Sequence, residues 1–173
     1  VRGASDWKSF KQAVSYQGNL YVLDTVGDQV WRYYPAGSGY DSEMKPLLES
    51  AELGDATHLA VDGDIYLLTE AGKIRKYVGG AAVDFKMVGL DTPIGTGASL
   101  FVTRDTKYLY VADPANSRVV VFDKNGTFRW QVVDERFRNV STLTVDEKGK
   151  AILFVAANQV FTAPLPAELA STG

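Results

Sequence analysis

The sequence has no cysteine and only one histidine, His58. Without cysteine, the chain cannot form a disulfide framework, a thiolate zinc site or a cysteine nucleophile. With one histidine, it cannot form a catalytic pair of histidines or a metal site built from several histidines. Neither a nucleophile-elbow sequence around a serine nor the Lys-Ser/Thr of a phosphate-binding loop is present. These absences exclude several common kinds of catalytic and metal chemistry.

Long apolar segments and clusters of basic residues are also absent. The longest wholly apolar run, residues 151–157 (AILFVAA), is far too short to span a bilayer, so we expect no membrane insertion within this chain. The 18 Lys and Arg against 21 Asp and Glu give a net charge of −3, which argues against nucleic acid as a partner. The first residue is Val1 rather than methionine, and we expect a processed product or a piece of a longer protein.

Four similar apolar segments recur along the 173 residues. They are LYVLD at 20–24, IYLLT at 65–69, LYVAD at 109–113 and LFVAA at 153–157, and their first residues are 45, 44 and 44 positions apart. A constant spacing of this size is the period of a four-stranded propeller blade. The sequence therefore predicts an all-β protein, a β-propeller of four-stranded antiparallel blades with about four blades in this chain.

Each apolar segment is flanked by further candidate strands that are rich in β-branched and aromatic residues and are bounded by turn residues. The first strands are expected at 13–16, 59–62, 100–103 and 143–146, and the third at 30–33, 74–77, 119–122 and 159–161. The fourth strands are expected at 45–48, 85–88 and 128–133, with none after the last core. The segment 6–10 either completes blade four or begins blade one.

The whole chain, residues 1–173, is predicted to form part of a single propeller. Its blades are expected at about 10–50, 56–90, 97–135 and 140–165, followed by a C-terminal tail at 166–173.

One stretch of blade three carries a family resemblance. Residues 113–123, DPANSRVVVFD, resemble the NHL repeat family of β-propellers, and residues 24–33 are a looser version. Blade two lacks the Asp and Asn of this pattern, and blade four has almost lost its turn. The resemblance implies a ring that usually has six blades, of which this chain would supply a part. Three outcomes remain open: a C-terminal fragment of a larger ring, a closed four-bladed ring, or chains that associate to complete one.

The chain also looks like the terminal blades of bacterial propellers attached to kinase or phosphatase signalling proteins. That likeness implies a sensory or scaffolding role, in the extracytoplasmic part of a bacterial membrane protein. The implied partner is a protein, a peptide or a cell-wall-type ligand.

The candidate binding residues lie in turns that a propeller would gather on one face. They are Asp24, Asp28, Glu70, Asp113 and Asn116, with the further candidate His58 and with Asp55 and Asp91 nearby on the connections between blades. Carboxylate and amide oxygens suit a divalent cation, as in a hydrolase-like propeller. The same Asp and Asn residues also bond their own backbone in turns, and this is the interpretation we favour. His58 is either a proton carrier or a structural residue.

Aromatic residues offer a further binding surface. The set is Trp7, Trp31, Trp130, Tyr33, Tyr34 and Tyr40, and these rings either form a patch for a sugar or peptide or, as we favour, pack between blades.

The leading hypothesis is a non-enzymatic propeller module that binds a ligand or a protein, with no catalytic residue, metal ligand or cofactor assigned. One alternative is a metal-assisted hydrolase of the lactonase-like propeller type. Another is a structural propeller fragment that oligomerises. An acidic channel that holds a cation would favour the hydrolase, whereas carboxylates engaged in salt bridges or in their own turns would favour the binding module.

Overall fold

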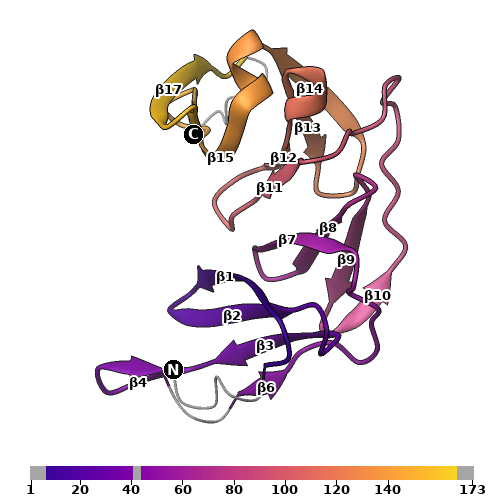
Figure 1. Ribbon diagram of the computed structural model, residues 1–173, viewed down its shortest axis with the longest axis vertical. Coiled ribbons are helices and arrows are strands. Elements are labelled where there is room, and N and C mark those ends of the chain that lie inside the picture. The colour runs from indigo at the N-terminus through magenta and orange to yellow at the C-terminus, as the bar shows by residue number, and fades with distance from the viewer. Residues whose placement is uncertain (1–6, 41–43, 167–173) are drawn as a thin grey trace. The chain divides into compact units, whose positions relative to one another are not determined.

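The computed structural model describes residues 7–40 and 44–166, which form antiparallel sheets joined by turns and two short 3-10 helices (Figure 1). Internal contacts divide the chain into two compact units, Val1–Thr69 with Ile74–Asp84 and Glu70–Lys73 with Phe85–Gly173. No helix among the described residues is long and apolar enough to cross a membrane.

The first unit contains two four-stranded sheets. Blade one has the strand order β1 (Phe10–Tyr16), β2 (Asn19–Asp24), β3 (Gln29–Tyr33) and β6 (Lys45–Pro46). Between β3 and β6, the chain forms a small hairpin of β4 (Pro35–Ala36) and β5 (Gly39–Tyr40). Blade two has the order β7 (Ala56–Val61), β8 (Ile65–Thr69), β9 (Ile74–Val78) and β10 (Ala81–Val83).

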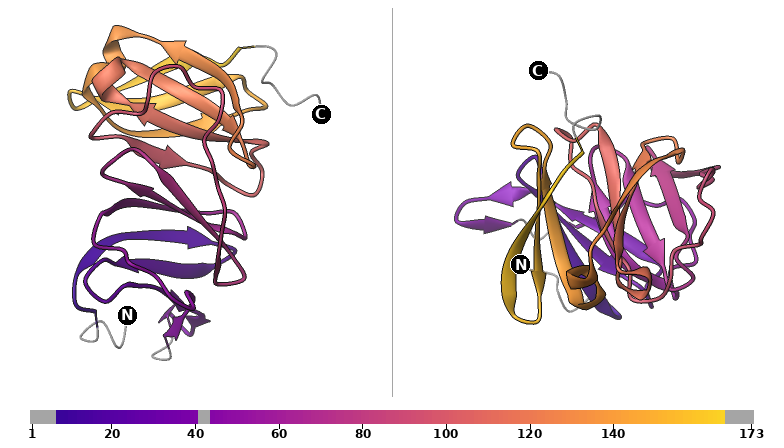
Figure 2. Two further views of the ribbon diagram at one scale, coloured as in Figure 1. Left: turned by 90° about the vertical axis from the view of Figure 1, so that its right-hand side faces the viewer. Right: turned by 90° about the horizontal axis from the view of Figure 1, so that it is seen from above.

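The second unit contains the other two sheets, seen from two further sides in Figure 2. Blade three has the order β11 (Ser99–Phe101), β12 (Tyr108–Asp113), β13 (Arg118–Asp123) and β14 (Phe128–Val133). The helix η2 (Pro114–Asn116) connects β12 to β13, and η3 (Glu135–Asn139) precedes blade four. Blade four has the order β15 (Val140–Asp146), β16 (Ala151–Ala156) and β17 (Gln159–Pro164). The predicted all-β fold of antiparallel sheets is thus confirmed.

Burial follows the position of each strand within its blade. Every residue of β8 and β12 is buried, which is typical of central strands covered on both faces, whereas the outer strand β14 is largely exposed. Each unit has its own core. The core of the first includes Leu23, Leu53 and Leu67, and the core of the second includes Tyr110, Val121 and Phe154.

The fourth strand of blade two differs from the prediction. The apolar residues at 85–88 were expected to form it, but β10 lies earlier, where Ala81 pairs with Val78. The intervening Gly79 and Gly80 have φ angles of 60° and 99° and close a two-residue turn directly after β9. Val88 instead forms an isolated parallel bridge with Thr127.

The N-terminal segment belongs to blade one. Phe10 begins β1, and the backbone N–H groups of Lys8 and Ser9 bond the Asp24 carboxylate at the end of β2. The expectation that residues 6–10 complete blade four is therefore wrong for residues 7–10, and residue 6 lies outside the described residues. In the part of the chain that the structure describes, blade four has three strands.

Candidate functional site

Asp24 ends β2 in blade one, and its buried carboxylate holds two segments together. One carboxylate oxygen accepts hydrogen bonds from the backbone N–H of Ser9 at 2.8 Å and of Gly27 at 2.9 Å. The other accepts from the backbone N–H of Lys8 at 3.0 Å and from the Trp31 indole at 3.4 Å. The bond to Gly27 lies within the turn itself, as the turn interpretation predicts. The bonds to Lys8 and Ser9 fix the segment that enters the blade.

These hydrogen bonds set the charge state of Asp24. Burial alone would raise the pKa of the carboxyl, but the bonds from Lys8, Gly27, Ser9 and Trp31 outweigh it and lower the pKa below 3.8. The site also leaves no room beside the carboxylate. A Cβ at Gly27 would lie 2.2 Å from a carboxylate oxygen. Asp24 is therefore an ionised group enclosed by its own turn.

The lowered pKa predicts how acid affects stability. Because the folded-state pKa is below the unfolded value, the ionised Asp24 stabilises the fold above about pH 4, and this contribution is lost as the pH falls through the folded pKa. We expect the difference in unfolding free energy between the wild type and Asp24→Asn to be larger at about pH 7 than at about pH 3. Urea unfolding across this range measures it. A difference between the wild type and Asp24→Asn that grows toward acid pH would contradict the lowered pKa of Asp24.

Asp28 and Asp55 also lie in the first unit, and each has its own partner. Asp28 is exposed, yet its carboxylate accepts the backbone N–H of Leu53 at 2.7 Å. Asp55 forms a bidentate ion pair with Arg75, with N–O distances of 2.7 and 2.8 Å. Both carboxylates therefore tie the connection between blades one and two to the surrounding turns.

His58 lies on β7 and is partly buried. Its Nδ1 is buried and has no hydrogen-bond partner among the described residues. Burial, followed by the positive charge of Lys11, lowers the pKa of the imidazole below its usual value of 6.5. The imidazole is therefore uncharged at pH 7, and the structural role of His58 stays a prediction.

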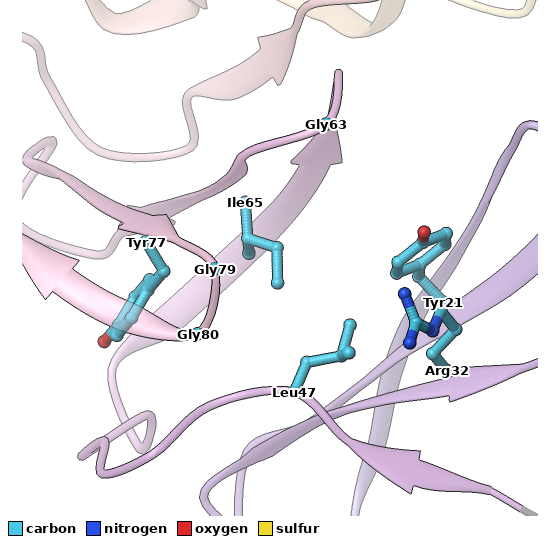
Figure 3. A pocket seen from close by; sticks show the side chains of 8 residues that line it. All are labelled: Tyr21, Arg32, Leu47, Gly63, Ile65, Tyr77, Gly79 and Gly80. Carbon is cyan, nitrogen blue, oxygen red and sulfur yellow. The ribbon is translucent and has the colours of Figure 1, made fainter.

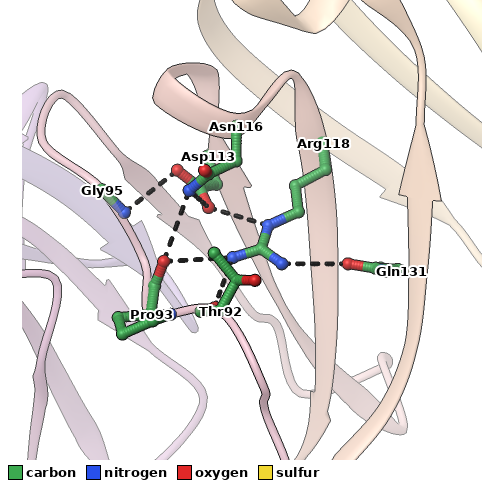
Figure 4. A network of polar contacts seen from close by, with 7 residues as sticks. All are labelled: Thr92, Pro93, Gly95, Asp113, Asn116, Arg118 and Gln131. Atoms are coloured by element: carbon green, nitrogen blue, oxygen red, sulfur yellow. Dashed lines mark hydrogen bonds and ion pairs between the residues drawn. The ribbon is translucent and has the colours of Figure 1, made fainter.

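Asp113 in the second unit is fully buried and forms an ion pair with Arg118 (Figure 4). The Arg118 Nε lies 2.9 Å from one carboxylate oxygen, and the same oxygen accepts the Asn116 amide at 2.8 Å. The other oxygen accepts the backbone N–H of Gly95 at 3.1 Å. The Asp, Asn and Arg of the stretch that resembles an NHL repeat thus meet in one network, which builds the turn between β12 and β13.

Arg118 extends this network on both sides. One terminal nitrogen donates to the backbone carbonyls of Thr92 at 2.7 Å and Pro93 at 3.1 Å, and the other donates to the Gln131 side chain at 3.0 Å. Every nitrogen of the guanidinium is therefore engaged (Figure 4). Glu70 and Asp91 are exposed, and neither belongs to this network.

Several polar residues with structural roles were missed by sequence reasoning. Arg118 stood inside the quoted motif, but nothing in the sequence indicated that it reaches Thr92 and Pro93. Glu147 is buried and accepts hydrogen bonds from the backbone N–H of Tyr108 and from the Tyr110 hydroxyl. It stands in a turn of charged residues, where the sequence gives no sign of burial. Among the described residues, no group of three acidic or histidine side chains could hold a metal ion.

No protein-family model matches the sequence, and no curated protein does. Solved structures are similar in fold. A protein from Bacteroides uniformis ATCC 8492 assigned as a 6-phosphogluconolactonase has a TM-score of 0.61 at 18% identity, and the match covers 94% of this chain and 52% of that one. The computationally designed protein Ika4 has a TM-score of 0.60 at 11% identity, with 91% and 92% covered. The chain has a β-propeller fold.

Other solved structures agree with this fold, but their identities to this chain are too low to indicate a shared function. Hsv2p from Kluyveromyces lactis has a TM-score of 0.60 at 11% identity, and a streptogramin B lyase has a TM-score of 0.52 at 13% identity. The chain covers 52% of Hsv2p and 54% of the lyase, so it spans about half the length of these natural propellers. At such identities the likeness supports the fold alone.

Proposed function

We propose that the chain is part of a non-enzymatic propeller module that binds a ligand or a protein partner. The observation that carries this proposal is the engagement of the turn carboxylates within the chain. Asp24 and Asp113 are fully buried, and their oxygens accept hydrogen bonds from the chain's own backbone and side chains. Groups held in this way shape loops rather than polarise a substrate, and loops on a rigid scaffold are common binding elements.

The six candidate residues then divide into two roles. Asp24 and Asp113 position the turns. Asp28 in the first unit and Glu70 and Asn116 in the second are exposed and are the groups we propose for ligand contact, and His58 lies on β7. The likeness to the terminal blades of bacterial signalling propellers supports a sensor or scaffold, and the partner we propose is a protein, a peptide or a cell-wall-type ligand.

A larger assembly is part of the same proposal. The chain spans about half of the natural propellers that it resembles, which supports completion of a ring by further blades of a longer bacterial protein or by self-association. Sedimentation analysis of the isolated chain separates these routes. A monomer at all concentrations favours further blades or a closed ring, and a stable dimer favours the oligomerising alternative.

The proposal predicts no metal-dependent hydrolysis. We expect millimolar Ca²⁺, Mg²⁺ or Mn²⁺ to leave the unfolding midpoint unchanged. If one of these ions did bind the folded chain, at about 100 times its Kd it would add about 2.7 kcal/mol to the free energy of unfolding and raise the midpoint. We also expect the chain not to accelerate the hydrolysis of a δ-lactone above the buffer rate, with or without these ions. Differential scanning fluorimetry and a pH-stat assay measure the two quantities.

The opposite result would favour the lactonase-like alternative. Metal-dependent hydrolysis that is lost in Glu70→Gln or Asn116→Ala would overturn the non-enzymatic proposal, because both residues are exposed and neither substitution breaks a buried ion pair. Arg138→Met, in the exposed pair with Glu135, is the matched surface control.

A further inference from the structure

A pocket of about 200 Å³ lies within the first unit, and none of the six candidate residues lines it (Figure 3). Its lining residues are Tyr21, Arg32, Leu47, Gly63, Ile65, Tyr77, Gly79 and Gly80. Gly63 in the β7–β8 turn and Gly79 and Gly80 in the β9–β10 turn border it. Asp55 precedes β7, so the pocket and Asp55 lie at opposite ends of that strand. The residues proposed for ligand contact and this pocket are thus separate features.

Arg32 is the one charged residue among the described residues that line the pocket. Its guanidinium lies beside the Tyr21 ring on the wall of the cavity (Figure 3). The Nε is buried and has no hydrogen-bond partner in residues 7–40 and 44–166. The guanidinium carbon lies 4.9 Å from the centroid of the Tyr34 ring. A buried cationic nitrogen without an acceptor is costly, and an anion in the pocket would remove that cost.

A second cation stands next to Arg32. In the register of β3 and β6, Arg32 lies directly opposite Lys45, and the Lys45 ammonium lies 5.5 Å from the same Tyr34 ring. Like charges directly opposite each other across two strands destabilise a sheet. Two cations around one ring, with no carboxylate among the described lining residues, produce a local field that favours a bound anion.

Leu47 and Ile65 give the pocket an apolar side. Leu47 and Ile65 point into the space between the two tyrosine rings (Figure 3). An added Cβ at Gly79 would meet no heavy atom within 4 Å, so this part of the turn borders free space. The volume equals that of about six or seven molecules of liquid water at roughly 30 Å³ each. A compact ligand with one charged and one apolar end matches these walls.

We propose that this pocket binds a small carboxylate with a short apolar tail. The planar guanidinium of Arg32 binds the carboxylate, because its donors match two carboxylate oxygens. The tail contacts Leu47 and Ile65. Lys45 adds attraction through its charge. This inference is independent of the residues proposed for ligand contact, since it involves none of the six candidate residues.

An NMR titration of the full 173-residue chain tests the proposal. The probe is sodium isobutyrate, with isobutyramide as the uncharged analogue of the same shape and inorganic phosphate as an anion without a tail. We expect isobutyrate to shift the backbone amides of Gly63, Gly79 and Gly80 in a saturable way. Isobutyramide and phosphate should bind at least ten-fold more weakly. Arg32→Gln should weaken isobutyrate binding at least ten-fold, and Arg75→Gln, in the exposed pair with Asp55, should leave it unchanged.

A second variant separates a folding defect from a binding defect. Leu47→Phe fills part of the cavity while it retains Arg32, and we expect it to weaken isobutyrate binding without altering the amide spectrum of blade three. Equal binding of isobutyrate and isobutyramide would overturn the proposal. So would binding that survives Arg32→Gln, or shifts produced by phosphate alone.

Discussion

Replacing Arg118 with methionine should lower the free energy of unfolding by about 3–5 kcal/mol, the usual cost of leaving one member of a buried ion pair without its partner. The side chains of Arg118 and Asp113 are only 7% and 0% exposed. Methionine keeps most of the apolar volume of the arginine. It leaves the buried Asp113 carboxylate without a positive charge, with only the hydrogen bonds from Asn116 and Gly95. It also removes the donors for the carbonyls of Thr92 and Pro93. Guanidinium unfolding followed by tryptophan fluorescence, to which Trp130 of the same blade contributes, measures the loss.

Arg138 provides the matched control for this substitution. It pairs with Glu135 at 3.0 Å, but the two side chains are 67% and 80% exposed. Arg138→Met should therefore cost less than about 1 kcal/mol, as exposed ion pairs usually do. If the two Arg→Met variants have equal stability, the network around Asp113 is not a major source of stability in blade three.

Asp24→Ala should cost about 3 kcal/mol or more, although it removes no ion pair. The carboxylate accepts backbone hydrogen bonds from Lys8, Ser9 and Gly27, and each bond to a charged acceptor is worth about 1.5–3 kcal/mol. Part of this loss of free energy is offset, because water can accept hydrogen bonds from the partly buried N–H groups after the substitution. We expect the loss to appear in urea unfolding, together with faster proteolysis of the segment that precedes β1.

The control for this second substitution is Asp55→Ala. Asp55 has two short contacts to Arg75, but the two side chains are 44% and 38% exposed. Its removal should cost less than about 1 kcal/mol. A cost for Asp55→Ala equal to that for Asp24→Ala would mean that burial does not distinguish the two carboxylates.

The repeating architecture could be predicted because each blade encodes it locally. The apolar segments at 20–24, 65–69, 109–113 and 153–157 became β2, β8, β12 and β16, with small differences in their ends. Their β-branched and aromatic residues suit strands that are covered on both faces, and turn residues flank each segment. The outer strands could not be located as well. In blade two, the Gly79–Gly80 turn set the pairing, whereas the apolar pattern at 85–88 suggested a strand that is not formed.

The candidate site was only partly predictable for a similar reason. Turn chemistry indicated that Asp24 bonds the backbone of its own turn, and Gly27, three residues further on, is its partner. Asp113 differs, because it bonds the side chains of Asn116 and Arg118. The longer connections could not be read from one sequence. Arg118 reaches Thr92 and Glu147 reaches Lys107, across 26 and 40 positions, and only the fold brings such residues together.

The carboxylates of Asp24 and Asp113 occupy the same position of their blades, at the end of the second strand. Each binds backbone N–H groups of the segment that enters its own blade, Lys8 and Ser9 in one case and Gly95 in the other. The corresponding positions in blades two and four are Thr69 and Ala157, neither of which carries a charge. The backbone amides bonded to these two carboxylates are therefore protected from local opening. The amides of Lys8, Ser9 and Gly95 should exchange their hydrogens slowly.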